Sequence, residues 1–140
     1  MIKNLLNSFL IIFFLPSFAF AKSQYFEAGL DLYNNKQLEK AKLKFEQDIV
    51  FNPKSELSYL YLSKIFHKQN KAKLEEHNLE TVMLLNPKNE EAIYNLAKLK
   101  LKNSDFRKSK ELNSRLKLIC KNFCDESEKL KIEIENLSKK

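Results

Sequence analysis

Apolar residues recur along most of this chain at the three- and four-residue spacing of amphipathic α-helices. The first such stretch begins near Lys22 and carries Tyr25, Ala28, Gly29 and Leu32 at positions i, i+3, i+4 and i+7. No run alternates apolar and polar residues between turn signals, as a half-buried strand would. The sequence holds one glycine and three prolines, so places to turn are few. The pattern therefore predicts an all-α protein with long helices and short loops.

The same pattern returns further along the chain at a fixed interval. The sequence separation between Tyr25 and Tyr59 is the same as that between the Asn-Pro-Lys triplets at 52–54 and 86–88. A fixed period of about 34 residues with helical patterning is typical of solenoids built from helix–turn–helix repeats. The sequence therefore predicts repeating units of two helices each.

In the first unit, the first helix should end near Asn34 and Asn35, because asparagine tolerates the left-handed conformation that stops a helix. A second helix should run from Leu38 until Pro53, since proline pushes the preceding residue out of helical dihedrals. The inward side chains of this second helix are expected to be Ala41, Phe45, Ile49 and Phe51.

These positions resemble the tetratricopeptide repeat, in which large and small residues alternate at helix crossings and proline closes the unit. The matching residues are Tyr25, Ala28, Gly29, Leu32, Ala41, Phe45 and Pro53 in the first copy, and Tyr59, Leu62, Ser63, Phe66, Leu79, Val82 and Pro87 in the second. Gly29 stands where a Cβ would hold two helices apart. Asp48 and Glu75 depart from the family pattern, because small residues are expected at both positions.

A third, weaker copy begins near Glu90, with Asn113 at the usual aromatic position and no closing proline. A last amphipathic stretch carries Leu130, Ile134 and Leu137, and a solenoid needs such a helix to cover its final apolar face. The resemblance thus implies a right-handed α-solenoid of about three repeats with a capping helix. The expected ranges are 22–55, 56–89 and 90–123 for the repeats and 125–138 for the cap.

The segment 1–21 has the three parts of a secretory signal. Lys3 gives a positive start, the run Leu5–Leu15 is almost wholly apolar, and positions 19–21 (Ala-Phe-Ala) match the small-x-small cleavage pattern. We expect cleavage after Ala21 and a periplasmic or secreted mature protein. An uncleaved inner-membrane anchor is the alternative, although the apolar run is shorter than the about 20 residues of a spanning helix.

The formal net charge of +7 does not by itself indicate a nucleic-acid partner. The lysines are spread over every predicted helix and interleaved with glutamates, as in 36–42 and 127–133. That distribution is typical of a solvated helical surface rather than of a basic binding stripe. No nucleic acid and no small-molecule substrate are expected as partners.

Cys120 and Cys124 are the two cysteines of the chain, and they follow a predicted secretory signal. In an oxidising compartment such a pair favours a structural disulfide, which would fix the corner where the third proline is missing. Free thiols with redox activity remain an alternative. A metal site is less well supported, because zinc needs about four ligands.

The sequence offers little that could carry catalysis. A single glycine excludes a glycine-rich phosphate loop, and no nucleophile–base spacing stands out. His67 and His77 lie in different predicted helices, which does not support a shared metal. We therefore expect no enzyme activity, no cofactor and no metal.

The resemblance also implies a groove, because ligand contacts in this family come mostly from the first helix of each repeat. The residues in register are Phe26, Leu30, Tyr33, Leu60, Lys64, His67, Tyr94, Lys98 and Leu101. Their mixture of apolar, aromatic and cationic side chains suits a peptide with apolar anchors and an acidic part. The hypothesis is a non-catalytic adaptor of the bacterial envelope that binds a peptide or protein segment, centred on the first repeat. A membrane-tethered accessory subunit and a thiol–disulfide active protein are the alternatives.

Overall fold

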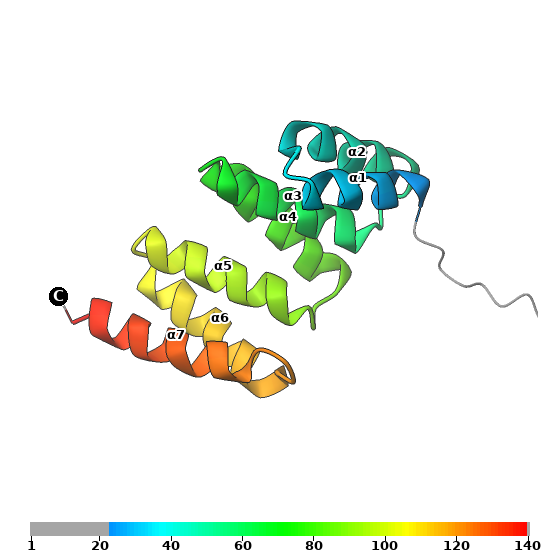
Figure 1. Ribbon diagram of the computed structural model, residues 1–140. Coiled ribbons are helices and arrows are strands. Elements are labelled where there is room, and N and C mark those ends of the chain that lie inside the picture. Colours follow the sequence, from blue (N-terminus) through cyan, green and yellow to red (C-terminus); the bar gives the residue numbers. More distant parts are fainter. Residues whose placement is uncertain (1–22, 140) are drawn as a thin grey trace, which may run out of the picture.

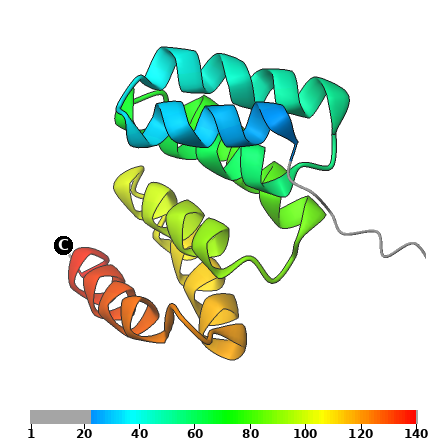
Figure 2. The ribbon, with the colours of Figure 1, turned by 45° about the vertical axis from the view of Figure 1, so that its right-hand side comes forward.

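The computed structural model describes residues 23–139, and all its regular elements within that range are α-helices stacked side by side (Figures 1 and 2). They are α1 (Gln24–Asn34), α2 (Leu38–Phe51), α3 (Glu56–Lys68), α4 (Ala72–Leu85), α5 (Glu90–Lys102), α6 (Phe106–Ile119) and α7 (Cys124–Leu137). The predicted signal peptide and its cleavage site lie outside the described residues. Over 23–139, no helix is long and apolar enough to cross a bilayer.

The helices pack as three antiparallel pairs followed by a single helix. Within the pairs, α1 contacts α2, α3 contacts α4 and α5 contacts α6. Contacts of α2 with α3 and of α4 with α5 join one pair to the next, and α7 packs on α6 and also reaches α5. The chain is therefore an all-α repeat solenoid closed at its C-terminal end by α7, as the sequence predicts.

The turn inside each pair uses one left-handed residue at the same repeat position. Lys36, Asn70 and Ser104 have φ of 60°, 55° and 62° and follow one another at the repeat period. The left-handed residue expected at Asn34 or Asn35 is instead Lys36, since Asn35 has φ −81°. The reason is that the chain must turn slightly later for the N–H of Gln37 to reach the carbonyl of Leu32, at 2.9 Å.

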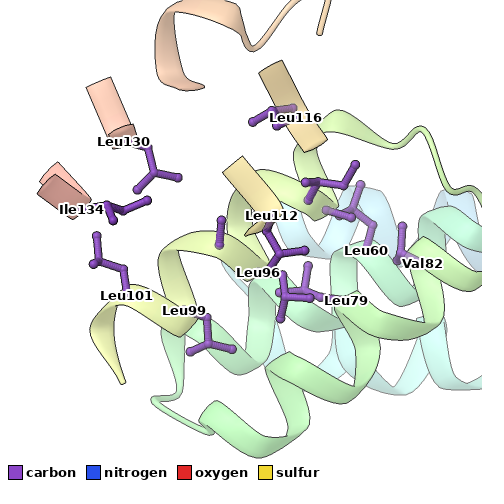
Figure 3. Close-up of a cluster of buried hydrophobic side chains, with 13 residues drawn as sticks. Leu60, Leu79, Val82, Leu96, Leu99, Leu101, Leu112, Leu116, Leu130 and Ile134 are labelled. Atoms are coloured by element: carbon purple, nitrogen blue, oxygen red, sulfur yellow. The ribbon is translucent and has the colours of Figure 1, made fainter. Parts of the chain in front are cut away.

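Buried apolar side chains form two clusters along the solenoid. The smaller cluster belongs to α1–α3 and is rich in aromatic rings, with Phe26, Phe45 and Phe66 among its members. The larger one runs from α3 to α7 and is aliphatic (Figure 3). In that view Leu130 and Ile134 of α7 point toward Leu101 and the α5 side of the cluster, so α7 covers the last repeat.

Two side chains of the first repeat differ from the predicted inward set. Phe51 is 70% exposed rather than buried, and Ile49 is only half-buried. Phe51 lies on the last turn of α2, where it stacks flat on Tyr25 with ring centroids 5.1 Å apart. The two rings lie where α1 begins and α2 ends, and both remain in contact with solvent.

Asp48, which departs from the family pattern, is fully buried because three hydroxyl groups satisfy its carboxylate. Ser23, Ser55 and Ser58 each donate a hydrogen bond to it. Ser23 also accepts the N–H of Phe26 as the N-cap of α1. A buried carboxylate is stable only when hydrogen-bonded, so Asp48 fastens the start of α1 and the α2–α3 turn to α2.

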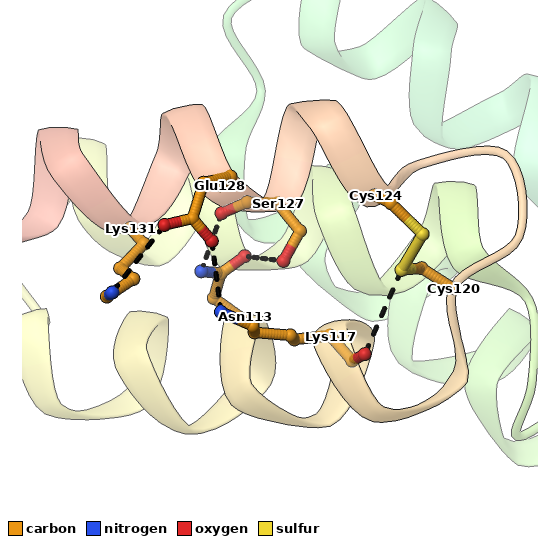
Figure 4. Close-up of polar contacts among 7 residues, drawn as sticks. All are labelled: Asn113, Lys117, Cys120, Cys124, Ser127, Glu128 and Lys131. Carbon is orange, nitrogen blue, oxygen red and sulfur yellow. Dashed lines mark hydrogen bonds and ion pairs between the residues drawn. A yellow bond between two sulfur atoms is a disulfide. The ribbon is translucent and has the colours of Figure 1, made fainter.

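The corner between α6 and α7 is stabilised by a disulfide and by hydrogen bonds (Figure 4). A disulfide joins Cys120 to Cys124, with their Cα atoms 5.3 Å apart. Asn113 donates from its amide to the carbonyl of Ser127 at 2.9 Å and accepts the Ser127 hydroxyl at 3.0 Å. Asn113 therefore replaces the aromatic residue of the family pattern with a polar contact to α7.

Glu90, the first residue of α5, holds the same corner from the other side. Its carboxylate accepts the backbone N–H groups of Lys121, Asn122 and Phe123 at 2.9, 2.9 and 3.0 Å. The bonds from Lys121 and Asn122 lower the pKa of Glu90 below its usual value. The loop that carries the disulfide is thereby tied to α5 as well as to α7.

Candidate functional site

A cavity of about 940 Å³ opens between the first helices of the repeats and α7. Its wall is built from α1, α3, α4, α5, α7 and the start of α6, so every repeat contributes to it. The lining residues are Tyr33, Ser63, Lys64, His67, Lys68, Glu75, Glu91, Tyr94, Asn95, Lys98, Leu99, Leu101, Lys102, Ser104, Phe106, Glu133 and Leu137. Most come from α3 and α5, so the site is centred on the second and third repeats rather than on the first.

Six of the nine side chains expected in the groove line this cavity: Tyr33, Lys64, His67, Tyr94, Lys98 and Leu101. Leu30 is not among the lining residues and packs against the aromatic cluster. Phe26 and Leu60 are not among the lining residues either and belong to the core, at 3% and 4% exposed; Leu101 is almost as buried, at 5%, but reaches the cavity wall. Phe26 is enclosed by the rings of Phe45 and Tyr61, 5.7 and 5.8 Å away, because α3 covers this face of α1.

Most of the lining residues that the sequence did not indicate are Ser63, Glu75, Glu91, Ser104 and Phe106 or belong to two further groups. One group follows a predicted position by a single residue, as Lys68, Asn95 and Lys102 do, because a helix presents neighbouring residues to the same wide cavity. The other group, Glu133 and Leu137, comes from α7. The sequence identified α7 as a cap, but only the packing of that helix shows that its last turns also form a wall.

The middle repeat places a hydrogen-bonded Glu–His pair where the other repeats have apolar or small side chains. Glu75 occupies the repeat position that Ala41 and Ser109 hold in the other units, and both of these are fully buried. The Glu75 side chain is 7% exposed, and its Oε1 lies 2.9 Å from Nδ1 of His67, whose side chain is 64% exposed. Glu75 therefore fixes the orientation of the His67 ring, leaving Nε2 as the nitrogen free for a ligand.

An ion pair crosses the cavity wall between α3 and α5. Nζ of Lys64 lies 2.7 Å from Oε1 of Glu91 and 4.7 Å from the ring centre of Tyr61. Lys100 and Glu76, which are not lining residues, are 2.6 Å apart and join α5 to α4, and the hydrogen bond to Glu76 raises the pKa of Lys100. Both pairs cross a repeat boundary and link neighbouring repeats.

Three lysines of the wall have no ion-pair partner among residues 23–139. Lys68 lies over the ring of Tyr33 at 5.3 Å, and Lys98 lies over the ring of Tyr94 at 5.8 Å. Lys102 is the third. Among residues 23–139, Glu133 is the one carboxylate lining the cavity that makes no ion pair. The cavity thus carries an excess of positive charge beside aromatic faces.

The remaining wall is apolar and comes from Tyr94, Leu99, Phe106 and Leu137. Tyr94 packs on Phe123 of the α6–α7 corner, with ring centroids 5.6 Å apart. The described residues contain no group of three His, Cys, Asp or Glu side chains that could hold a metal, and His77 is exposed away from the cavity. The arrangement suits non-covalent binding of a segment with apolar and acidic side chains.

Solved structures support the fold, whereas no family model and no curated protein matches this chain. The Yersinia enterocolitica type III secretion chaperone SycD, in complex with a peptide of the translocator YopD, superposes with a TM-score of 0.73 at 16% identity, covering 84% of this chain and 93% of its own. The first tetratricopeptide domain of Spaghetti (RPAP3), bound to the HSP90 peptide SRMEEVD, gives 0.74 at 12% identity, with coverages of 83% and 91%.

The tetratricopeptide domain of Arabidopsis OM64 is also similar, with a TM-score of 0.68 at 18% identity over 78% of this chain and 93% of that domain. At these identities the similarity is one of fold. Together with the repeat period, it shows that this chain has a tetratricopeptide-type fold.

Proposed function

We propose that this protein is a non-catalytic adaptor that binds a peptide or protein segment in the cavity between α3, α5 and α7. The observation that carries the proposal is the composition of the cavity wall, in which Lys68, Lys98 and Lys102 lack acidic partners within residues 23–139 and lie beside aromatic and leucine side chains. A segment with one or two large apolar residues and several acidic ones would complement both features.

Two of the similar structures support this proposal, because both are complexes with peptides. SycD holds a peptide of YopD, and the RPAP3 domain holds a peptide whose sequence contains two adjacent glutamates. Both proteins share the solenoid that creates the cavity here, although their identity to this chain is low.

A library of random linear peptides displayed on phage would test the proposal. Selection on the full chain should enrich peptides that combine acidic with large apolar residues. Binding of the enriched peptides should weaken about tenfold in K68E/K98E/K102E, because each exposed ion pair contributes about 0.2–1 kcal/mol. The matched control is K40E/K73E/K129E, which makes the same charge change at exposed lysines outside the cavity.

Equal weakening in both triple variants would show that only net charge matters and would contradict a specific site. Enrichment of basic peptides would contradict the proposed ligand class. A Tyr94→Ala variant, which removes an aromatic face from the wall, should lose affinity for the same peptides without any change in charge.

The proposal places this adaptor in the bacterial envelope. It is supported by the apolar run Leu5–Leu15 with the small-x-small pattern at 19–21, and by the disulfide between Cys120 and Cys124. The N-terminal residue of the protein recovered from an envelope fraction tests this point. Lys22 would indicate a cleaved signal, Met1 a retained anchor, and recovery from the cytoplasm alone would contradict the assignment.

A further inference from the structure

The most exposed large apolar side chains of the described residues gather at one edge of the solenoid. Val50, Phe51, Leu84 and Leu118 are 74%, 70%, 80% and 87% exposed, and every other large apolar residue in 23–139 is 54% exposed or less. All four lie in the last two positions of a helix. We call this set of four the apolar edge. Single exposed apolar side chains are ordinary on a protein surface. Four of them at equivalent helix ends form a patch instead.

Three of these residues occupy the same repeat position. Val50, Leu84 and Leu118 follow one another at the repeat period, and each is the penultimate residue of its helix, α2, α4 or α6. Figure 1 shows these three helix ends along the right-hand side of the solenoid, and Figure 2 keeps them on one side after rotation. The repeat therefore carries one outward apolar side chain per unit in a row.

Each member of the row has an exposed lysine close behind it. Lys54 and Lys88 lie in the turns four residues after Val50 and Leu84, and Lys121 lies three residues after Leu118. Lys54 and Lys88 have no ion-pair partner within residues 23–139, whereas the charge of Lys121 interacts with the carboxylate of Glu90. The row therefore combines solvent-exposed apolar side chains with two lysines that are free to bind anions.

The carboxylates near this edge are largely engaged inside the protein. Glu56 accepts the side-chain amides of Asn86 and Asn89, and Glu90 accepts three backbone N–H groups of the α6–α7 corner. The exposed acidic residue Asp125 belongs to the first turn of α7, where the helix dipole offsets part of its charge.

The N-terminal part of the chain joins the fold at the same edge. Ser23 donates a hydrogen bond to Asp48 of α2, and Tyr25 stacks on Phe51. The residues before Ser23 therefore connect to the solenoid beside the apolar edge, and their sequence includes the apolar run Leu5–Leu15. In the alternative in which this run is retained as an anchor, the chain would enter the solenoid from the bilayer at the apolar edge.

We propose that the apolar edge docks on an anionic lipid bilayer. Its four apolar side chains would enter the boundary between headgroups and acyl chains, and Lys54, Lys88 and Lys121 would lie among the anionic headgroups. The cavity residues Lys68, Lys102 and Leu137 lie at the opposite ends of α3, α5 and α7, so docking would leave that end of the cavity open to a partner.

The chain contains no tryptophan, so one introduced tryptophan reports on its own surroundings. The test compares L84W with L74W in the full chain, mixed with phosphatidylglycerol vesicles whose acyl chains carry bromine as a quencher. Both positions are exposed on α4 and are about 15 Å apart along the helix. Both variants have the same N-terminal segment, so only docking of the edge distinguishes them.

Docking predicts a blue shift and at least about twofold quenching of the indole in L84W, with little change in L74W. Adding K54Q/K88Q to L84W should lower the ratio of docked to undocked chains by about 30-fold, because each lysine near an anionic surface contributes about a factor of five. The matched control, K40Q/K73Q, removes two exposed lysines from the opposite ends of α2 and α4 and should leave the quenching unchanged.

Equal quenching in L84W and L74W, or none in L84W, would overturn the proposal. So would a blue shift in L84W that appears without vesicles and grows with protein concentration, because the edge would then be an interface with a second copy of the chain. Quenching in L84W that is the same in phosphatidylcholine and phosphatidylglycerol vesicles would overturn the role assigned to the lysines.

Discussion

The first and the last repeat fill the same buried positions with different residues. Two positions illustrate this, one on the first helix of each repeat and one on the second helix. The residues at both positions are buried in all three repeats. The pairs are Gly29 with Phe45, Ser63 with Leu79, and Ala97 with Asn113. Where the first residue is glycine the second is the largest, and where a Cβ is present the second is smaller. The first two repeats thus keep the combined size of the pair similar rather than the residue types, whereas Ala97 and Asn113 together fill less space.

The two ends of the solenoid also differ in what holds them. The first repeat packs the Phe45 ring directly against Gly29 and builds an aromatic cluster around it. The last repeat has Asn113 in the place of that ring, and it gains the hydrogen bonds to Ser127, the Glu90 anchor and the disulfide. Polar and covalent links therefore stabilise the end where aromatic packing is missing.

The largest expected effect comes from removing the aromatic ring. Phe45 is fully buried, so Phe45→Ala should lower the free energy of unfolding by about 3–5 kcal/mol, measured by denaturant titration. Asn113→Ala at the equivalent position should cost less, because it removes two hydrogen bonds of about 0.5–1.5 kcal/mol each. A larger loss for Asn113→Ala would contradict the contrast between the two ends.

Placing a methyl group on Gly29 tests the size matching directly. A Cβ there would lie 2.7 Å from Cε1 of Phe45. Gly29→Ala should therefore destabilise, because overpacking costs about 1–3 kcal/mol and exceeds the about 0.5–1 kcal/mol that alanine adds in a helix.

The double variant G29A/F45L, which brings the pair close to Ser63 and Leu79, should recover part of that loss. A double-mutant cycle measures the coupling between the two positions. Additive effects of the two substitutions would show that the glycine and the ring do not determine each other.

The disulfide should matter at one end only. Replacing Cys120 and Cys124 by serine should lower the free energy of unfolding by about 2 kcal/mol, the loop-closure value for so short a loop. Because repeats interact mainly with their neighbours, hydrogen exchange should accelerate in α6 and α7 and stay unchanged in α1 and α2. Acceleration throughout the chain would show that the solenoid unfolds as one unit.

The smallest effect is the pH dependence of the α6–α7 corner. Backbone hydrogen bonds lower the pKa of Glu90 below 4.5, so its contribution to stability is present above that value and is lost as the pH falls through the lowered pKa. The amide signals of Lys121, Asn122 and Phe123 should therefore shift together in an acid titration followed by NMR. In Glu90→Gln these shifts should disappear, and a transition above pH 4.5 would contradict the assignment.

The sequence predicted the repeating helix pairs because their signals are local. The apolar spacing and the Asn-Pro stops each act within one or two turns of chain, and the repeat period follows from their recurrence. It also predicted the glycine at the close helix crossing, where a Cβ would now meet Phe45. The burial of side chains at repeat ends was harder to predict. Phe51, for example, would be buried only if another helix covered it, and it is 70% exposed.

The site was only partly predictable for the same reason. Tyr33, His67 and Leu101 lie at one repeat position and all line the cavity, as the family resemblance implied. The same resemblance also placed Phe26 and Leu60 in the groove, although both are buried in the core. It gave no sign that Glu75, a departure from the family pattern, reaches the cavity wall and orients His67.

The sequence by itself determined the helix pairs, their period and their turn positions, because backbone preferences and amphipathic spacing operate between near neighbours. Only the tertiary structure shows which side chains form hydrogen bonds with Asp48 and Glu75. It alone also shows where the cavity is centred and that α7 forms one of its walls. These features depend on side chains from different helices meeting in space. Their distances are set by the packing of whole repeats, which no single stretch of sequence specifies.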